Sequence, residues 1–365
     1  MNRNICIISP SYPPRICGIA DYTYMLSNHL SSSGCNINII TSTQNASGDN
    51  VKHIDNNWDN RTINEAIRII SEIKPEVVHI QYQAGLYNHN PELLLLPPKL
   101  KKMGIKSVAT YHDLNGPALL GKLSRFALLL FMTRCNINIV CSFKQLSAVR
   151  RIPFIKNKVV QIPVGAVVDP IPYNKNNNLN SPPLILHFGF IWRDRGLESL
   201  VDACIEVKKN YGDIQLVFAG GIVDKSYPAE IKKRANVGGL NDDNIIFTDA
   251  LENNDLSKLI HQSDICVLPF PTGASHGRST LATCAIHKKP IITTYVKDNC
   301  PKEFIHKQNI MLYNPDNIKE LTDNIISLLK NDKLRKYISN EIDNAMSSSK
   351  WENIANAHIA LYEKL

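Results

Sequence analysis

The stretch "DPIPYNKNNNLNSPPLILHFGF", residues 169–190, separates two halves of the chain that repeat one pattern. Its first part is rich in Pro and Asn and has no apolar period, which is typical of a linker. The apolar run at 184–190 then restarts the alternation of strands and helices. We therefore expect a first domain at 1–168, a linker at 169–183 and a second domain at 184–346.

Both halves alternate short β-branched runs with helical segments, the pattern of parallel α/β units. In the first half, strands are predicted at 5–9, 37–42, 77–82, 107–112, 137–142 and 159–164, with helices near 18–33, 63–73, 91–103, 117–134 and 143–150. In the second half, strands are predicted at 184–190, 214–220, 244–249, 265–270, 290–295 and 309–313. The sequence thus predicts an α/β fold made of two doubly wound domains.

Further helices are expected at 316–330, 333–346 and 350–364. The last segment, "KWENIANAHIALYEKL", places Trp351, Ile354, His358 and Tyr362 on one helical stripe. This apolar face packs either on its own domain or back across the first domain, and the sequence leaves both alternatives open.

Composition narrows the class of protein. The chain has 365 residues, a formal net charge of +8 and nine scattered Cys without CxxC spacing, which indicates reduced thiols in the cytoplasm. The first residues lack the apolar region of a signal peptide, and no apolar run is long enough to span a bilayer. The positive charge favours anionic partners, but the dispersed Lys and Arg without interleaved aromatic residues argue against nucleic acid.

Doubly wound sheets bind ligands at the carboxyl ends of their strands, so the residues just past each strand are candidates for a site in a cleft between the domains. In the first half, a glycine opens a helix where an anion could approach, polar side chains suit a hydroxyl-rich ligand, and a His-Asp pair ends a strand. These candidates are Arg15, Gly18, Gln81, Gln83, Tyr87, His112 and Asp113.

The second half offers a phosphate site. "HFGFIWRDRGLESL" (187–200) places Arg193 and Arg195 between a strand and a helix, either as a phosphate clamp or as solvated surface charges. "GASHGRSTLATCA" (273–285) supplies a flexible turn and a cation before a helix that is expected to begin near Ser279 or Thr280. Their hydroxyls could cap this helix while its first N–H groups point at an anion. The predicted pyrophosphate-binding site in this stretch comprises Gly273, Ser275, Arg278, Ser279, Thr280 and Leu281.

The order of motifs resembles the retaining GT-B glycosyltransferases of family 4, nearly end to end. The motifs are "PPRICGIADY", "VVHIQYQ", "YHD", "QIPVG", "HFGFIWRDRGLESLVDA", "LVFAGG", "DLSKLIHQSDICVLPF", "KKPIITT" and the closing "WENIA" and "LY". The resemblance implies two Rossmann-like domains facing across a cleft, with a crossover helix (347–365) that returns to the first. It also implies a nucleotide-sugar donor, such as a UDP- or GDP-sugar, an acceptor held by the first domain, and no cofactor or metal.

Two departures from the family pattern affect the donor site. The family's signature is a Glu, seven further residues and a second Glu; the two Glu positions align with Ser275 and Thr283. Phe190 stands where an Arg is common in the family. Arg195, by contrast, falls where the family has its phosphate-binding Lys. Either the turn around Arg278 has taken over donor binding, or the donor site has decayed.

These observations predict a hexosyltransferase of bacterial surface polysaccharide synthesis that acts on a glycan or lipid-linked acceptor, with His112, Asp113 and Arg195 as catalytic residues. The alternatives are a non-catalytic nucleotide-sugar-binding partner subunit and a sugar-nucleotide epimerase of the same fold. Basic residues in 97–106 and 121–134 predict weak, electrostatic recruitment to the anionic inner face of a membrane. The Leu/Phe stripe of 117–134 is assigned to a buried helix.

Overall fold

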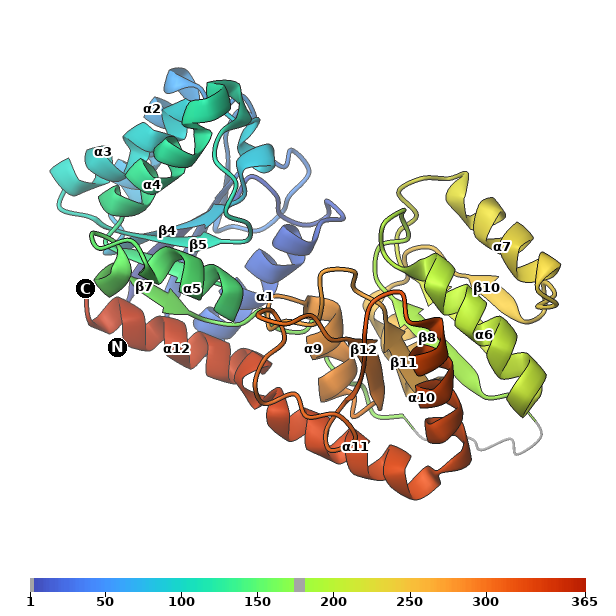
Figure 1. Cartoon of the computed structure of the whole chain (residues 1–365). Coiled ribbons are helices and arrows are strands. Elements are labelled where there is room, and N and C mark those ends of the chain that lie inside the picture. The colour runs from blue at the N-terminus through green and yellow to red at the C-terminus, as the bar shows by residue number, and fades with distance from the viewer. Residues whose placement is uncertain (1–2, 174–180) are drawn as a thin grey trace. The chain divides into compact units, whose positions relative to one another are not determined.

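The computed structural model describes residues 3–173 and 181–365, so 174–180 of the expected linker lie outside the described residues. The chain divides into two compact units: one runs to Val167 and includes Trp351–Leu365, and the other is Val168–Lys350. Each unit contains a parallel β-sheet covered by helices (Figure 1). The two parallel α/β sheets confirm the predicted fold class.

The first unit has a sheet in the order β3-β2-β1-β4-β5-β6-β7. Its strands are β1 (Asn4–Ile8), β2 (Asn36–Thr41), β3 (Val51–His53), β4 (Val77–Tyr82), β5 (Lys106–Tyr111), β6 (Ile137–Val140) and β7 (Val159–Gln161). Its helices are α1 (Gly18–Ser32), α2 (Asn60–Ile73), α3 (Leu96–Lys102), α4 (Ser124–Arg134) and α5 (Phe143–Arg150), with the 3-10 segments η1 (Ala84–Tyr87), η2 (Pro91–Leu95), η3 (Ala118–Leu123) and η4 (Lys156–Lys158). The central β4 is buried at every position, as expected for a strand covered on both faces.

The second unit has a sheet in the order β10-β9-β8-β11-β12-β13. Its strands are β8 (Leu184–Phe188), β9 (Gln215–Ala219), β10 (Ile245–Phe247), β11 (Ile265–Leu268), β12 (Ile291–Thr294) and β13 (Met311–Tyr313). Its helices are α6 (Leu197–Tyr211), α7 (Tyr227–Val237), α8 (Asn253–Gln262), α9 (Ser279–Ile286), α10 (Ile318–Lys330) and α11 (Asp332–Ala345), followed by η5 (Ser347–Ser349). The strand order reverses between β8 and β11, which makes their carboxyl ends the switch point where such sheets bind ligands.

The described residues at the start of the expected linker pack on the second unit. The backbone N–H of Ile171 donates to Ser257 Oγ in α8 at 3.1 Å, and the Tyr173 ring stacks on His261 with 5.6 Å between centroids. Ile171 and Tyr173, which the sequence assigns to the linker, therefore pack against α8.

The last helix, α12 (Trp351–Glu363), belongs to the first unit and packs along α1. Trp351 Nε1 donates to the Ala166 carbonyl oxygen at 2.7 Å, and a Cβ at Gly165 would lie 2.4 Å from the indole. Tyr362 Oη lies 2.7 Å from His79 Nδ1 in β4. Of the two alternatives for this helix, the return to the first domain is confirmed.

No helix within residues 3–173 and 181–365 is long and apolar enough to cross a membrane.

Candidate active site

Two loops meet at the switch point of the second sheet, and glycines bring them together. The first follows β8 and the second follows the neighbouring β11. Gly196 has φ 75°, and a Cβ there would lie 2.4 Å from the Pro269 carbonyl oxygen. Gly189 has φ 144°, and its Cβ would lie 3.5 Å from Thr280 Cγ2. The absence of a side chain at Gly196 lets its backbone approach the loop after β11.

Arg195 and Arg278, one from each loop, supply the positive charge. The Arg278 guanidinium lies over the Phe270 ring, 4.6 Å from its centroid, and donates to Thr272 Oγ1 at 2.6 Å. Burial lowers the pKa of Arg278, and the nearby charge of Arg195 lowers it further. In the part of the chain that the structure describes, neither arginine has a carboxylate within ion-pair distance. Two neighbouring cations without a counterion favour binding of an anion.

Helix α9 adds backbone donors to this site. It begins at Ser279 with Arg278 as N-cap, and no side chain caps it. The predicted capping by Ser279 or Thr280 is wrong, because both residues lie inside the first turn. The first intrahelical bond runs from the Ala282 N–H to the Arg278 carbonyl oxygen at 3.1 Å. Among the described residues, the N–H groups of 279–281 have no acceptor and remain available to an anion.

A backbone hydrogen bond and a closely packed glycine hold the turn before α9 in place. The Arg278 N–H donates to the Ser275 carbonyl oxygen at 3.2 Å, which closes a tight turn. Gly273 has φ 87°, and a Cβ there would come within 2.8 Å of Val296 Cβ. The side chain of Leu281 is fully buried in the core, so only its backbone N–H can serve the donor site predicted for it.

Arg193 differs from Arg195 and Arg278 because it has carboxylate partners. Its guanidinium donates to Asp224 Oδ2 at 3.1 Å and to Glu230 Oε1 at 2.5 Å, and it lies 5.1 Å from the centroid of the Tyr227 ring. Two carboxylates offset its charge. Of the three arginines predicted to hold phosphate, Arg195 and Arg278 are thus the two without a carboxylate partner among the described residues.

Three further side chains at this edge were not found from the sequence. His187 Nδ1 donates to the Val267 carbonyl oxygen at 3.1 Å, and burial lowers the pKa of His187 to about 4. His276 is buried and its Nε2 lies 2.5 Å from Glu303 Oε1. Glu303 thus brings a carboxylate to the loop in which Ser275 replaces the family's first Glu. At the second Glu position, the buried Thr283 hydroxyl donates to the Ser279 carbonyl oxygen at 2.8 Å.

In the first unit, the predicted acceptor residues form a support for His112. His112 Nε2 donates to Gln81 Oε1 at 2.9 Å, and the Tyr87 hydroxyl donates to the Gln81 carbonyl oxygen at 3.2 Å. Gln81 and Tyr87 are both buried; Gln81 contacts His112 directly, whereas Tyr87 contacts the backbone of Gln81. Burial lowers the pKa of His112 to about 4, which keeps the imidazole neutral at pH 7.

The other predicted residues of the first unit lie apart from this support. Gln83 Oε1 accepts the Leu86 N–H at 2.9 Å and caps η1, and Asp113 Oδ1 accepts the Asn115 N–H at 3.0 Å. Arg15 and Gly18 are exposed before and at the start of α1, and a Cβ at Gly18 would meet no atom within 4 Å. The space above the start of this helix is therefore open.

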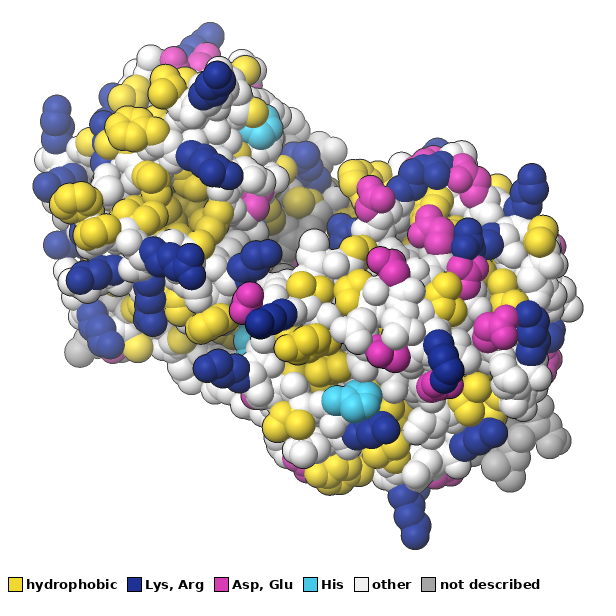
Figure 2. Space-filling view, viewed as in Figure 1, with side chains coloured by type: hydrophobic (Ala, Val, Ile, Leu, Met, Phe, Trp, Pro, Cys, Tyr) yellow, Lys and Arg dark blue, Asp and Glu magenta, His cyan; other side chains and the backbone are white. Residues whose placement is uncertain are grey.

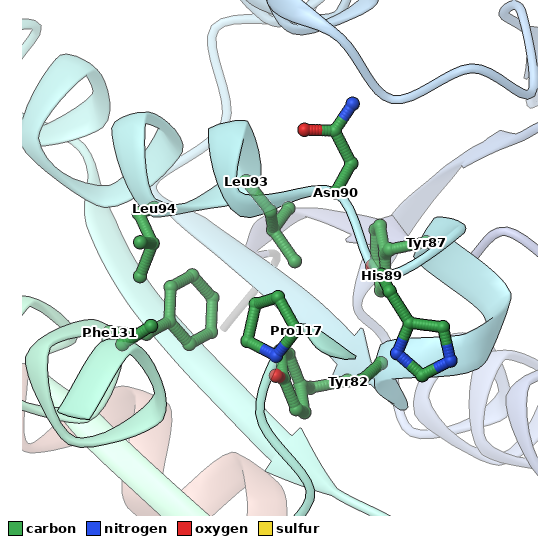
Figure 3. A pocket seen from close by; sticks show the side chains of 10 residues that line it. Tyr82, Tyr87, His89, Asn90, Leu93, Leu94, Pro117 and Phe131 are labelled. Atoms are coloured by element: carbon green, nitrogen blue, oxygen red, sulfur yellow. The ribbon is translucent and has the colours of Figure 1, made fainter. Parts of the chain in front are cut away.

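An apolar pocket lies between the carboxyl end of β4, η2 and α4. Figure 3 shows Phe131, Leu94 and Leu93 on one side and Pro117 and Tyr82 facing them. The pocket encloses about 260 Å³ including its mouth. Its lining residues are Tyr82, Ala84, Tyr87, His89, Asn90, Leu93, Leu94, Pro117, Ala127 and Phe131.

Parallel doubly wound sheets are typical of Rossmann-like proteins, and the uncapped start of α9 beside two arginines is a candidate anion site at the switch point. Residues 16–169 match the family described as Glycosyltransferase Family 4, and residues 182–331 match the one described as Glycosyl transferases group 1. The chain belongs to this family of glycosyltransferases. No curated protein sequence matches it.

Solved structures confirm the GT-B fold. The chain is similar to a glycosyltransferase from Rickettsia africae (TM-score 0.77, 16% identity, 100% of this chain and 98% of that chain). It is also similar to Anabaena HepE in complex with UDP and glucose (TM-score 0.75, 13% identity, 100% of both chains). WaaG, a glycosyltransferase involved in lipopolysaccharide biosynthesis, has a TM-score of 0.68 at 12% identity over 98% of this chain and 99% of that chain.

Proposed function

We propose that the protein transfers a hexosyl group from a nucleoside diphosphate sugar, such as a UDP- or GDP-sugar, to a hydroxyl of a glycan or lipid-linked acceptor, with retention. The observation that supports this most is the pair of arginines without carboxylate partners, among the described residues, beside the uncapped α9. The UDP bound to HepE and the role of WaaG in lipopolysaccharide biosynthesis support a nucleotide-sugar donor and a surface-glycan acceptor. The nine free cysteines are consistent with a reducing cytoplasm.

The proposed reaction breaks the bond between the anomeric carbon and the β-phosphate oxygen, and negative charge develops on that phosphate. Arg195, Arg278 and the first N–H groups of α9 stabilise this charge more strongly in the transition state than in the bound donor. The acceptor hydroxyl attacks the anomeric carbon from the side that the diphosphate leaves, and its proton passes to the departing phosphate oxygen. Neutral His112 positions the sugar or the acceptor. These cationic groups take the role of a metal ion, so we propose metal-independent transfer.

Two alternatives from other classes are kept because specific observations favour them. The lack of carboxylates at Ser275 and Thr283 favours a non-catalytic nucleotide-sugar-binding subunit. The similarity to a putative UDP-N-acetylglucosamine 2-epimerase from Listeria monocytogenes (TM-score 0.67, 12% identity, 100% of this chain and 98% of that chain) favours an epimerase.

A donor panel distinguishes the three functions. The protein is incubated with UDP-, GDP-, ADP- and dTDP-sugars, and both free nucleoside diphosphate and altered sugar nucleotide are quantified. We expect slow release of diphosphate from one donor, faster release with a membrane-lipid or glycan extract, and the same rates in EDTA. An isomerised donor without diphosphate release would identify an epimerase. Donor binding without turnover, with or without the extract, would identify a binding subunit.

A further inference from the structure

The surface formed by η3 and the outer side of α4 exposes large apolar side chains. Leu119 is 71% exposed, Leu123 63% and Phe126 65%. The predicted continuous helix over 117–134 is interrupted at Gly121, which has φ 50°. The inner side of α4 enters the core, as expected, through Ala127, Leu128, Phe131 and Met132. The sequence predicts that the whole Leu/Phe stripe lies in the interior, and the structure corrects this for its first part.

The segment of sequence that contains these side chains is rich in cations and has no acidic residues. Residues 114–168 contain no Asp or Glu and eight Lys or Arg, namely Lys122, Arg125, Arg134, Lys144, Arg150, Arg151, Lys156 and Lys158. Helix α3, which contacts α4, adds the exposed Lys101 and Lys102, and the exposed Met103 follows it directly. Figure 2 shows hydrophobic side chains gathered over α3 and α4, with Lys and Arg side chains around them.

We propose that the η3–α4 face, defined as Leu119, Lys122, Leu123, Arg125 and Phe126, docks onto the surface of an anionic lipid bilayer. The apolar side chains enter the interface between headgroups and acyl chains, and the cations contact the lipid phosphates. In the part of the chain that the structure describes, Lys122 and Arg125 have no carboxylate partner, so docking breaks no ion pair there.

The apolar side chains decide between a membrane and another polyanion. A nucleic acid would neutralise the cations but would leave Leu119 and Leu123 against a charged phosphate backbone, where they gain little. A bilayer interface accommodates both the apolar side chains and the cations of this face. Pro117, Ala127 and Phe131, which line the apolar pocket of Figure 3, come from the same segment of chain as this face. This inference goes beyond the proposed transfer reaction and does not depend on it.

Vesicle flotation of the full chain, without donor, tests the proposal. The vesicles are phosphatidylcholine alone or phosphatidylcholine with phosphatidylglycerol. We expect binding to the anionic vesicles only, and weaker binding at high salt. The variant Leu119→Ser/Leu123→Ser/Phe126→Ser should bind at least tenfold more weakly at unchanged charge. Lys122→Gln/Arg125→Gln should lose affinity by about fivefold for each charge removed.

Matched controls come from α7 and the turn before it. Val237, which is 84% exposed, is replaced by Ser, and the exposed Lys225 and Lys233 are replaced together by Gln. Both controls should bind within twofold of the wild type, and thermal unfolding verifies that every variant is folded. Three results would overturn the proposal: no vesicle binding, equal binding to neutral vesicles, or equal binding by the apolar variant. Preferential binding to RNA that the apolar variant retains would assign the face to nucleic acid instead.

Discussion

His112 directly follows β5. One of its ring nitrogens is hydrogen-bonded to Gln81, and the other can accept a further hydrogen bond. Since Gln81 Oε1 accepts from Nε2 at 2.9 Å, the second nitrogen, Nδ1, carries no proton when the ring is neutral. Because burial lowers its pKa to about 4, the imidazole is neutral at pH 7, so Nδ1 can accept a hydrogen bond from a hydroxyl and the ring offers no positive charge to a phosphate. Its contribution should therefore appear in transfer and not in nucleotide affinity.

We expect His112→Ala to lower turnover at least tenfold, about 1.4 kcal/mol of transition-state stabilisation, with diphosphate affinity within twofold of the wild type. Steady-state kinetics and calorimetry with the matching nucleoside diphosphate measure the two quantities. His53→Gln, at an exposed position of the edge strand β3, serves as a control in the same unit. A diphosphate affinity that falls as far as turnover would contradict this role.

How far single residues could be predicted depended on where their partners lie in the sequence. Arg195 and Arg278 are candidates from the sequence because a strand-to-helix loop and a turn before a helix indicate an anion site. Arg193 looked equivalent to Arg195, since Glu230 lies 37 residues away and nothing local indicates that pair. His276 and Glu303 were missed for the same reason, because they meet across 27 residues of chain.

At the scale of elements, α12 is the segment whose removal should affect the first unit most. Trp351 is buried against Gly165 and donates to Ala166, while Tyr362 contacts His79, whose Nε2 lies 3.5 Å from Gln81 Nε2. The helix therefore covers the core of the first unit and also contacts the side chains behind His112.

We expect Trp351→Ala to lower the free energy of unfolding of the first unit by about 3–5 kcal/mol, the usual cost of truncating a buried aromatic residue. Urea denaturation followed by far-UV circular dichroism measures the change. Tyr337→Ala, at a half-exposed position of α11, should change it by less than about 0.5 kcal/mol. Equal stability of the two variants would show that α12 does not hold the unit together.

Apolar periodicity located most elements because their buried faces repeat in the sequence, as in β4 at 77–82 and α5 at 143–150. It missed β3, which has three residues and buries only Val51. It also merged η3 with α4, since the backbone conformation of Gly121 has no signature in apolar spacing. The apolar stripe of α12 does not identify the surface that it covers, so the return of this helix to the first domain is predicted by the family resemblance alone.

At the scale of the whole molecule, buried neutral histidines make stability depend on pH. Burial lowers the pKa of His187, His287 and His358 to about 4, and that of His79 well below its usual value. The unfolded chain binds protons with the ordinary histidine pKa of about 6.5. Lowering the pH from 6.5 towards 4 therefore favours unfolding, and above pH 6.5 the titration of these groups adds no pH dependence to stability.

We expect the free energy of unfolding to fall between pH 6.5 and 4 by about 1.4 kcal/mol per pH unit for each such histidine. Urea midpoints at pH 7.5, 6.5, 5.5 and 4.5 measure it. His358→Gln should make the dependence shallower, whereas His53→Gln, at an exposed position, should leave it as in the wild type. A midpoint that stays constant from pH 6.5 to 4.5 would disprove that these rings are held neutral.

The central claim is that Arg195 and Arg278 hold the donor diphosphate, and calorimetric titration of the preferred nucleoside diphosphate tests it most directly. We expect Arg195→Ala and Arg278→Ala each to weaken binding at least tenfold, about 1.4 kcal/mol, because each removes a cation that has no carboxylate partner among the described residues. Arg193→Ala, at a position whose guanidinium is already paired with Asp224 and Glu230, should stay within twofold of the wild type. Wild-type affinity in the Arg195 and Arg278 variants, or a larger loss in the Arg193 variant, would contradict the account.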